Sequence, residues 1–150
     1  MKTFLKSFLL LCFFISPNLY ASDLIMARSS LGFPEAMLAL QESLKEHGYK
    51  VARVQRIDIG LTGLGYKTDK YRVVFVGKTD EISYLVNKYP QLVPYMPPKA
   101  AIFAERGDTV LVTANPQIYS QMINDEKDQY IFDRWESDVY SVFDDYRKAE

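Results

Sequence analysis

Apolar side chains recur with the period of a helix between residues 33 and 48. Those within one stripe of about 100° on the helical wheel are Phe33, Ala36, Met37, Leu40 and Leu44. Pro34 suits a first helical turn, because its missing N–H would have no intrahelical partner there. Gly48 suits the left-handed position that follows a helix. The pattern therefore predicts a helix between Pro34 and Gly48.

A second helical pattern, more strongly amphipathic, occupies residues 129–150. Its apolar positions span about 120° of the helical wheel: Ile131, Phe132, Trp135, Val139, Val142, Phe143 and Tyr146. Many acidic side chains lie on the opposite face, which disfavours binding to an anionic membrane surface. We expect this helix to dock onto the sheet of its own domain, and an interface with a second copy or a partner is the alternative.

Runs of β-branched and aromatic residues predict five strands. They cover residues 23–28, 49–59, 71–76, 100–104 and 109–113. The run from Tyr71 to Val76 is almost continuously apolar, as in a strand that is covered on most of its surface. Residues 105–108 have the composition of a hairpin loop. Within residues 49–59 the alternation of apolar and polar residues changes phase. A β-bulge would bring the apolar residues of both halves onto one face of the strand.

Shorter elements connect these strands and helices. Thr79 is a predicted N-cap for a short helix that ends at Lys88. Residues 60–69 contain three glycines and are predicted to form a loop. Asn115 and Pro116 together predict the start of a further helix. The order of the elements predicts an α+β fold in two layers, with a largely antiparallel sheet and helices on one face.

The first 21 residues have the three-part pattern of a secretory signal peptide. A basic start with Lys2 and Lys6 precedes an apolar run, and the segment ends on the small residue Ala21. Pro17 stops the run short of the about 20 apolar residues that a membrane-spanning helix needs. The sequence therefore predicts cleavage near Ala21 and an exported protein, periplasmic or secreted, without a stable membrane span.

Removal of this segment changes the composition in two ways. The only cysteine, Cys12, leaves with it, so the mature chain has no thiol for disulfides, thiolate catalysis or thiolate metal sites. Losing Lys2 and Lys6 leaves 16 basic residues against 19 acidic ones, a net charge of −3. Such a surface has no electrostatic reason to bind nucleic acid.

Few residues of the chain are candidates for catalysis or metal binding. His47 is the only histidine, and its place at the end of the first helix predicts a structural contact with the terminal carbonyl groups. A haem ligand at His47 is the weaker alternative, and no other metal site is predicted. The carboxylates of Asp125, Glu126 and Asp128 lack the spacing of a calcium loop, so they are predicted to be solvated surface.

The chain from Ser29 to Pro116 resembles the domain-of-unknown-function 302 (DUF302) family. The matching stretches are Phe33–Ala36, Leu44–Tyr49, Tyr71–Gly77, the prolines before Ala101–Phe103, and Val110–Val112. The resemblance implies a curved antiparallel sheet similar to the TATA-binding-protein-like architecture, often found as a dimer, with no established activity and no catalytic residues. It implies a DUF302-like domain at residues 22–128, which the helix of residues 129–150 follows.

Without a catalytic constellation, the sequence favours a non-enzymatic domain that binds a small apolar or amphipathic ligand or a protein partner, with no cofactor. Tyrosine has an apolar body and a polar tip, and the middle strands carry basic residues. The candidate ligand-binding residues are accordingly Tyr66, Tyr71, Arg72 and Tyr95. A small enzyme using carboxylate, tyrosine and arginine chemistry is the alternative. A deep pocket with a shifted carboxylate would favour the enzyme, whereas a filled core with a flat apolar patch would favour partner binding.

Overall fold

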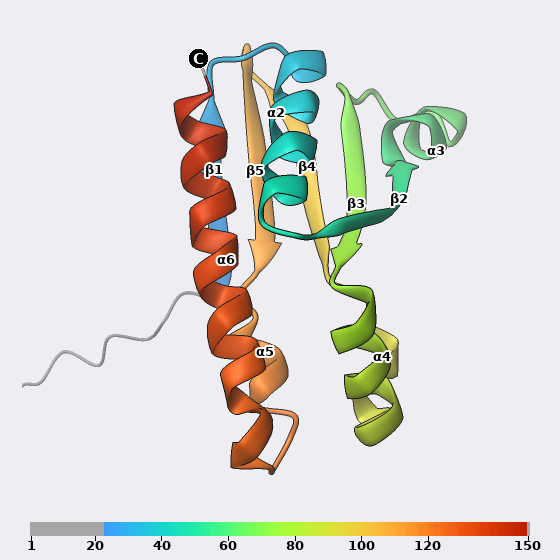
Figure 1. Ribbon diagram of the computed structural model, residues 1–150. Coiled ribbons are helices and arrows are strands. Elements are labelled where there is room, and N and C mark those ends of the chain that lie inside the picture. The colour runs from blue at the N-terminus through green and yellow to red at the C-terminus, as the bar shows by residue number, and fades with distance from the viewer. Residues whose placement is uncertain (1–22, 150) are drawn as a thin grey trace, which may run out of the picture.

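Five strands form one antiparallel sheet with the order β1-β5-β4-β3-β2 (Figure 1). The computed structural model describes residues 23–149. The strands are β1 (Leu24–Ser29), β2 (Lys50–Arg56), β3 (Tyr71–Gly77), β4 (Lys99–Glu105) and β5 (Asp108–Ala114). β4 and β5 form the predicted hairpin, whose two connecting residues, Arg106 and Gly107, have φ angles of 53° and 96°. The two sheet edges are β1 and β2.

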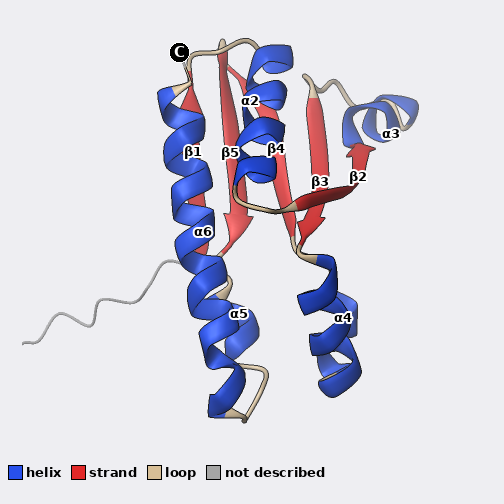
Figure 2. Ribbon diagram, in the orientation of Figure 1, coloured by secondary structure: helices blue, strands red, loops and turns tan. Residues whose placement is uncertain are grey.

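Two long helices lie on the same side of this sheet (Figure 2). They are α2 (Phe33–Glu46) and α6 (Gln129–Lys148). The shorter helices are α3 (Ile57–Gly63), α4 (Thr79–Lys88) and α5 (Gln117–Ser120), with 3-10 segments at Pro90–Tyr95 (η2) and Glu126–Asp128 (η3). In Figure 1, α4 and α5 continue beyond one end of the strands. The predicted two-layer α+β fold, with its helices on one sheet face, is confirmed.

The first core cluster lies between the sheet and the two long helices. Strand residues enter it from one face of the sheet only: Ile25, Ala27, Val74, Val76, Ala100, Ile102 and Leu111. The predicted stripes of α2 and α6 supply Leu40, Leu44, Phe143 and Tyr146, among others. The buried hydroxyl of Tyr146 donates a hydrogen bond to the carbonyl of Thr109 at 3.1 Å. Docking of α6 onto its own sheet is therefore confirmed.

The second core cluster lies past the end of the sheet, among α4, η2, α5 and α6. Its buried members include Leu85, Leu92, Phe132 and Trp135. Tyr49 packs against both clusters and therefore connects them. Burial raises the pKa of Tyr49, and its hydroxyl donates to Asp138 at 3.0 Å.

The segment after β2 differs from the sequence prediction. The strand expected over residues 49–59 ends at Arg56, and helix α3 occupies residues 57–63, where the strand end and a glycine-rich loop were expected. Asp58 in the first turn suits the positive end of the helix, and Arg72 on β3 binds its carboxylate. The contact between Asp58 and Arg72, which are distant in sequence, favours a short helix that the local sequence does not predict.

The bulge in β2 and the ends of helices α2 and α4 can be compared with the sequence predictions. The register of β2 against β3 shifts between Val51 and Arg53, so the predicted bulge is confirmed. The predicted cap at Thr79 is wrong, because Thr79 lies inside α4 and Lys78 is the N-cap residue without a side-chain cap. Left-handed Gly48, with φ 77°, follows α2 as predicted.

Within residues 23–149, no helix is both long and apolar enough to cross a membrane. The predicted signal peptide, its cleavage at Ala21 and Cys12 lie outside the described residues.

Candidate functional site: the open face of the sheet

Side chains of alternate strand residues point away from the helices and form the second face of the sheet, here called the open face. Pairing of the strands aligns Met26, Val112, Ala101 and Val73 in one row across it. Phe103 and Tyr71 lie in the next row towards the hairpin, and Lys99 and Phe75 lie in the row on the other side. No residue of this face belongs to either core cluster of the described chain.

The open face is apolar although it is not covered. Met26 is 54% exposed, and Val73, Phe75, Ala101, Phe103 and Val112 are half-buried by their own neighbours in the sheet. No residue of β3 is exposed, as expected for a central strand, although no helix lies over its outward side. A continuous apolar run here reflects two apolar faces, of which the helices cover one.

A hollow of about 330 Å³ lies in the open face where the loop before β3 meets β3, β4 and β5. Tyr71, Ala101, Phe103 and Val112 line its apolar part, and Thr68, Asp69 and Lys70 line its polar edge. The small side chain of Ala101 leaves this space beside the ring of Phe103, which meets Tyr71 edge to face with 5.9 Å between ring centroids. A second hollow, of about 460 Å³, borders α3 and shares residues 68–70 with the first.

Charged residues border the open face at its two ends: both signs at the hairpin end, and basic residues at the other. At the hairpin end, Arg28 binds the carboxylates of Glu105 and Asp108, the second at 3.2 Å, and Arg106 adds a second positive charge near Glu105. Arg28 also holds the pKa of Glu105 below its usual range. At the other end, Lys99 and Arg53 flank Phe75 and form no ion pair within residues 23–149.

The four ligand-binding candidates do not converge on one site. Tyr71 lines the hollow of the open face. Arg72 points to the opposite side of the sheet and forms an ion pair with Asp58. The hydrogen bond from Arg72 lowers the pKa of Asp58 below its usual value. Tyr66 lies 64% exposed after α3. Tyr95 lies in η2, where its ring is 6.4 Å from that of Tyr119.

His47 makes the contact that the structural interpretation predicts. Its Nδ1 atom lies 2.9 Å from the carbonyl oxygen of Ser43, which can only accept a hydrogen bond, and 3.8 Å from Asp145. In the described part of the chain, no group of three or more His, Cys, Asp or Glu side chains is arranged to hold a metal ion. Haem binding through His47 stays a prediction.

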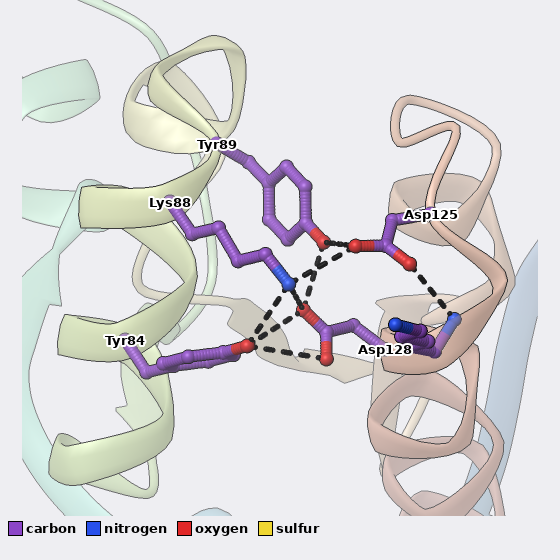
Figure 3. Close-up of polar contacts among 6 residues, drawn as sticks. Tyr84, Lys88, Tyr89, Asp125 and Asp128 are labelled. Carbon is purple, nitrogen blue, oxygen red and sulfur yellow. Dashed lines mark hydrogen bonds and ion pairs between the residues drawn. The ribbon is translucent and has the colours of Figure 1, made fainter.

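A polar network connects α4 with the segment before α6, and sequence reasoning missed it (Figure 3). Asp128 is 5% exposed. Its carboxylate accepts hydrogen bonds from Tyr89 at 2.8 Å, from Lys88 at 2.9 Å and from Tyr84 at 3.0 Å. Asp125 joins the same group through Lys88 at 3.0 Å. The prediction that Asp125 and Asp128 are solvated surface is therefore wrong for the buried Asp128.

The network stabilises charged forms and does not create an acid catalyst. Burial pushes the pKa of Asp128 up, but hydrogen bonds from Lys88, Tyr89 and Tyr84 outweigh it and hold this pKa below its usual value. Hydrogen bonds from Lys88 and the Lys127 backbone similarly lower the pKa of Asp125. Contact with Asp128 raises the pKa of Lys88. Both carboxylates and the ammonium group therefore stay charged at neutral pH, as in a structural clamp.

The spacing Tyr-x-x-x-Lys-Tyr from Tyr84 to Tyr89 is the only local signal for this network. Tyr84 and Lys88 are four residues apart and therefore lie on one face of α4. Their acceptors are about forty residues away in sequence, and nothing local indicates which of the acids they contact.

Comparisons with known proteins agree with this architecture. The model of a family described as a domain of unknown function, DUF302, matches residues 25–144. The chain is also similar to a crystal structure of an uncharacterized conserved DUF302 protein from Bacillus stearothermophilus. Their TM-score is 0.76 at 23% sequence identity, and the match covers 85% of this chain and 100% of that chain. No curated protein matches the chain.

Proposed function

This chain belongs to the DUF302 family, for which no function is known, and we propose that it is an exported, non-catalytic domain that binds a second copy of itself through the open face. The observation that carries the proposal is the apolar open face, from Met26 on β1 to Phe75 on β3. Monomeric proteins rarely expose contiguous apolar patches of several hundred Å² without a function.

The size of the open face fits a modest interface. Five strands about 4.8 Å apart and seven residues long, at about 3.3 Å per residue, give roughly 550 Å² before the relief of side chains is added. Standard interfaces bury about 800 Å² on each partner. We therefore expect a dimer with a micromolar dissociation constant.

The alternative of an enzyme has less support. Each carboxyl group with a shifted pKa in residues 23–149 is shifted downward: Asp58, Glu105, Asp125 and Asp128. A general acid needs the opposite shift, towards neutral pH. The enclosed space between the two long helices and the sheet is only about 30 Å³, so the core is nearly filled.

Val73→Lys tests the proposed interface. The variant places an ammonium group near the middle of the open face, where a second copy would bring another lysine close to it, and we expect the dissociation constant of the dimer to rise at least tenfold. Analytical ultracentrifugation at protein concentrations from about 1 to about 200 µM, a range that brackets the expected constant, measures the dissociation constant of the dimer. Leu38→Lys is the matched control, because Leu38 is 57% exposed on α2 and far from the open face.

Wild-type protein that stays monomeric over the whole concentration range would contradict self-association. A dimer that Val73→Lys leaves intact would place the interface elsewhere on the molecule.

Export is the second part of the proposal, and it rests on the signal-peptide pattern. We expect the mature protein, periplasmic or secreted, to begin at or near Ser22, immediately after Ala21. Intact-mass spectrometry of protein recovered from the periplasm and from the medium measures the new N-terminus. Recovery of the chain with Met1 attached and only in the cytoplasm would contradict export.

A further inference from the structure

The two edges of the sheet are closed to different degrees. At the β1 edge, Arg147 of α6 donates a hydrogen bond at 2.7 Å to the carbonyl oxygen of Met26. β2 forms the other edge, and Figure 1 shows it at the side of the sheet away from α6. All seven residues of β2 are exposed, and within residues 23–149 it pairs with β3 alone. β2 is therefore the edge that is open to a further strand.

The backbone of β2 directs hydrogen-bonding groups away from the sheet at Val51 and Val54. In an antiparallel sheet, alternate residues of a strand bond to opposite neighbours. Val76 of β3 donates its N–H to the carbonyl oxygen of Pro98, on the β4 side, at 2.9 Å, so Val74 also bonds towards β4. Val51 and Val54 are the β2 residues opposite these two valines. Their N–H and C=O groups therefore point outwards, where no group of the described chain bonds to them.

The side chains of β2 divide by chemistry between the two faces of the sheet. Val51 and Val54 lie on the helix side, opposite core residues of β3, and each is 38% exposed. Leu38 on α2 and Val51 border the same hollow of about 550 Å³. Arg53 lies on the open-face side, opposite Phe75. An added strand therefore places alternate side chains beside the valines and those between them beside Arg53.

β2 is positively charged along its whole length. Its charged residues are Lys50, Arg53 and Arg56, and none is acidic. Lys50 and Arg53 form no ion pair within the described part of the chain, and Arg56 lies 3.9 Å from Asp58. Because Arg72 already binds Asp58, positive charge stays in excess from one end of the strand to the other.

Neighbouring elements do not remove this excess. Glu42 lines the hollow beside Val51, but Lys45 and Lys50 line it as well. On the open-face side, Lys99 lies next to the same phenylalanine as Arg53. The surroundings of the edge are therefore also basic on balance.

The charge of β2 makes a second copy of the same edge a poor occupant. Two β2 strands side by side bring together strands that each carry three positive charges and no negative one, so they repel each other in every register. Charged residues commonly prevent an edge from pairing with its own copies. The same charges attract a strand of the opposite sign.

We propose that the β2 edge binds an extended segment of another protein in which acidic and apolar side chains alternate, and that this segment adds a further strand to the sheet. Its backbone bonds to Val51 and Val54. Its apolar side chains lie beside these valines and Leu38, and its carboxylates lie beside Lys50 and Arg53. In strand addition, main-chain hydrogen bonds supply affinity and side chains supply specificity. The inference does not depend on the open-face dimer, because it uses the backbone groups of the sheet edge.

A synthetic peptide of alternating valine and glutamate, about eight residues long and blocked at both ends, tests the site. We expect it to bind, and isothermal titration calorimetry measures its dissociation constant. The same peptide with lysine in place of glutamate is the control. It is expected to bind at least about tenfold more weakly, because like charges then face each other.

Arg53→Glu tests the charge complementarity. The variant is expected to raise the dissociation constant of the glutamate peptide at least about tenfold and to lower that of the lysine peptide. Lys127→Glu is the matched control, because it makes the same change of net charge at an exposed residue of η3. It is expected to leave both constants within about twofold of wild type, since distant surface charges are screened. Circular dichroism verifies that both variants are folded.

N-methylated peptides test the backbone contact without changing charge. Directly opposite residues share a face and, at Val51 and Val54, exchange backbone hydrogen bonds, so the valines of the peptide direct their N–H groups towards β2. N-methylation of these valines is expected to weaken binding at least about tenfold, because it removes the donors. N-methylation of the glutamates is the control and is expected to stay within about threefold, since their N–H groups point away from β2.

Amide hydrogen exchange followed by NMR locates the added strand. The outward N–H of Val54 is expected to exchange at least about tenfold more slowly when the glutamate peptide is saturating. The amide of Met26, on the opposite edge of the sheet, is expected to be unaffected.

Three results would overturn the inference. Absence of binding up to about 1 mM glutamate peptide would leave the basic residues as protection of the edge alone. Equal binding of the two N-methylated peptides would mean that charge attracts the peptide without strand addition. Protection of the Val54 amide that grows with protein concentration, without any peptide, would assign the edge to a second copy.

Discussion

Trp135→Ala is expected to lower the free energy of unfolding by about 3–5 kcal/mol, the usual cost of removing a large buried aromatic side chain. Trp135 is 2% exposed in the second core cluster and packs edge to face on Phe132, with 5.6 Å between ring centroids. The substitution leaves a cavity where α6 meets α4 and η2. Urea unfolding at pH 7, followed by circular dichroism, measures the change.

Two control variants separate the contributions of Trp135. Trp135→Phe keeps most of the ring but loses the hydrogen bond from Nε1 to Glu81 at 2.6 Å, so a loss of about 1–3 kcal/mol is expected. Tyr130→Ala, on an exposed position of the same helix, is expected to stay within about 0.5 kcal/mol of wild type. A loss below 1 kcal/mol for Trp135→Ala would mean that the second cluster contributes little to global stability.

Asp128→Ala is expected to cost about 2–3 kcal/mol, because it removes the charged acceptor on which three donors converge. Tyr84, Lys88 and Tyr89 lose this partner together, and the more exposed Asp125 is the carboxylate that stays in contact with Lys88 and Tyr89. The contact between α4 and the start of α6 is weakened as a result. Glu126→Ala is the control, since Glu126 is exposed in the same 3-10 turn.

The effect of Asp128 has a defined pH dependence. The folded protein lowers the pKa of Asp128 and of Asp125, so their contribution to stability is fully present above the unfolded value of about 3.9 and is lost as pH falls through the folded pKa. The difference in unfolding free energy between wild type and Asp128→Asn is therefore expected to be constant from about pH 5 to 8 and to shrink below about pH 4. Urea midpoints across this range measure it. A difference that grows towards acid pH would contradict the lowered pKa.

Helices with a long apolar stripe were predicted well. The pattern from Phe33 to Leu44 and the pattern from Ile131 to Tyr146 correspond to α2 and α6, and most stripe residues are buried. The spacing of apolar residues along a helix can be recognised in the local sequence. An apolar stripe of this width has to be buried against another element of the fold. The strand from Tyr71 and the hairpin at Gly107 were predicted from equally local signals, an apolar run and the turn composition of residues 105–108.

Elements that depend on distant partners were missed. Nothing near Ile57 indicates that Arg72 will bind Asp58 and favour α3. Asp128 was interpreted as a solvated carboxylate, because the donors that bury it lie on α4. Of the four ligand-binding candidates, Tyr71 alone lies in a hollow of the open face, because tyrosine composition does not determine which rings converge.

The sequence by itself determined the fold class, the positions of the two long helices, the order of the strands along the chain and the resemblance to DUF302. Only the tertiary structure decided that the helices cover one apolar face of the sheet and leave the other, and that Lys99, Ala101, Phe103 and Glu105 of β4 lie on the uncovered face. The physical reason is that a linear pattern records whether a side chain is apolar or charged. Whether another element reaches that side chain depends on strand pairing and packing between residues that are far apart in the chain.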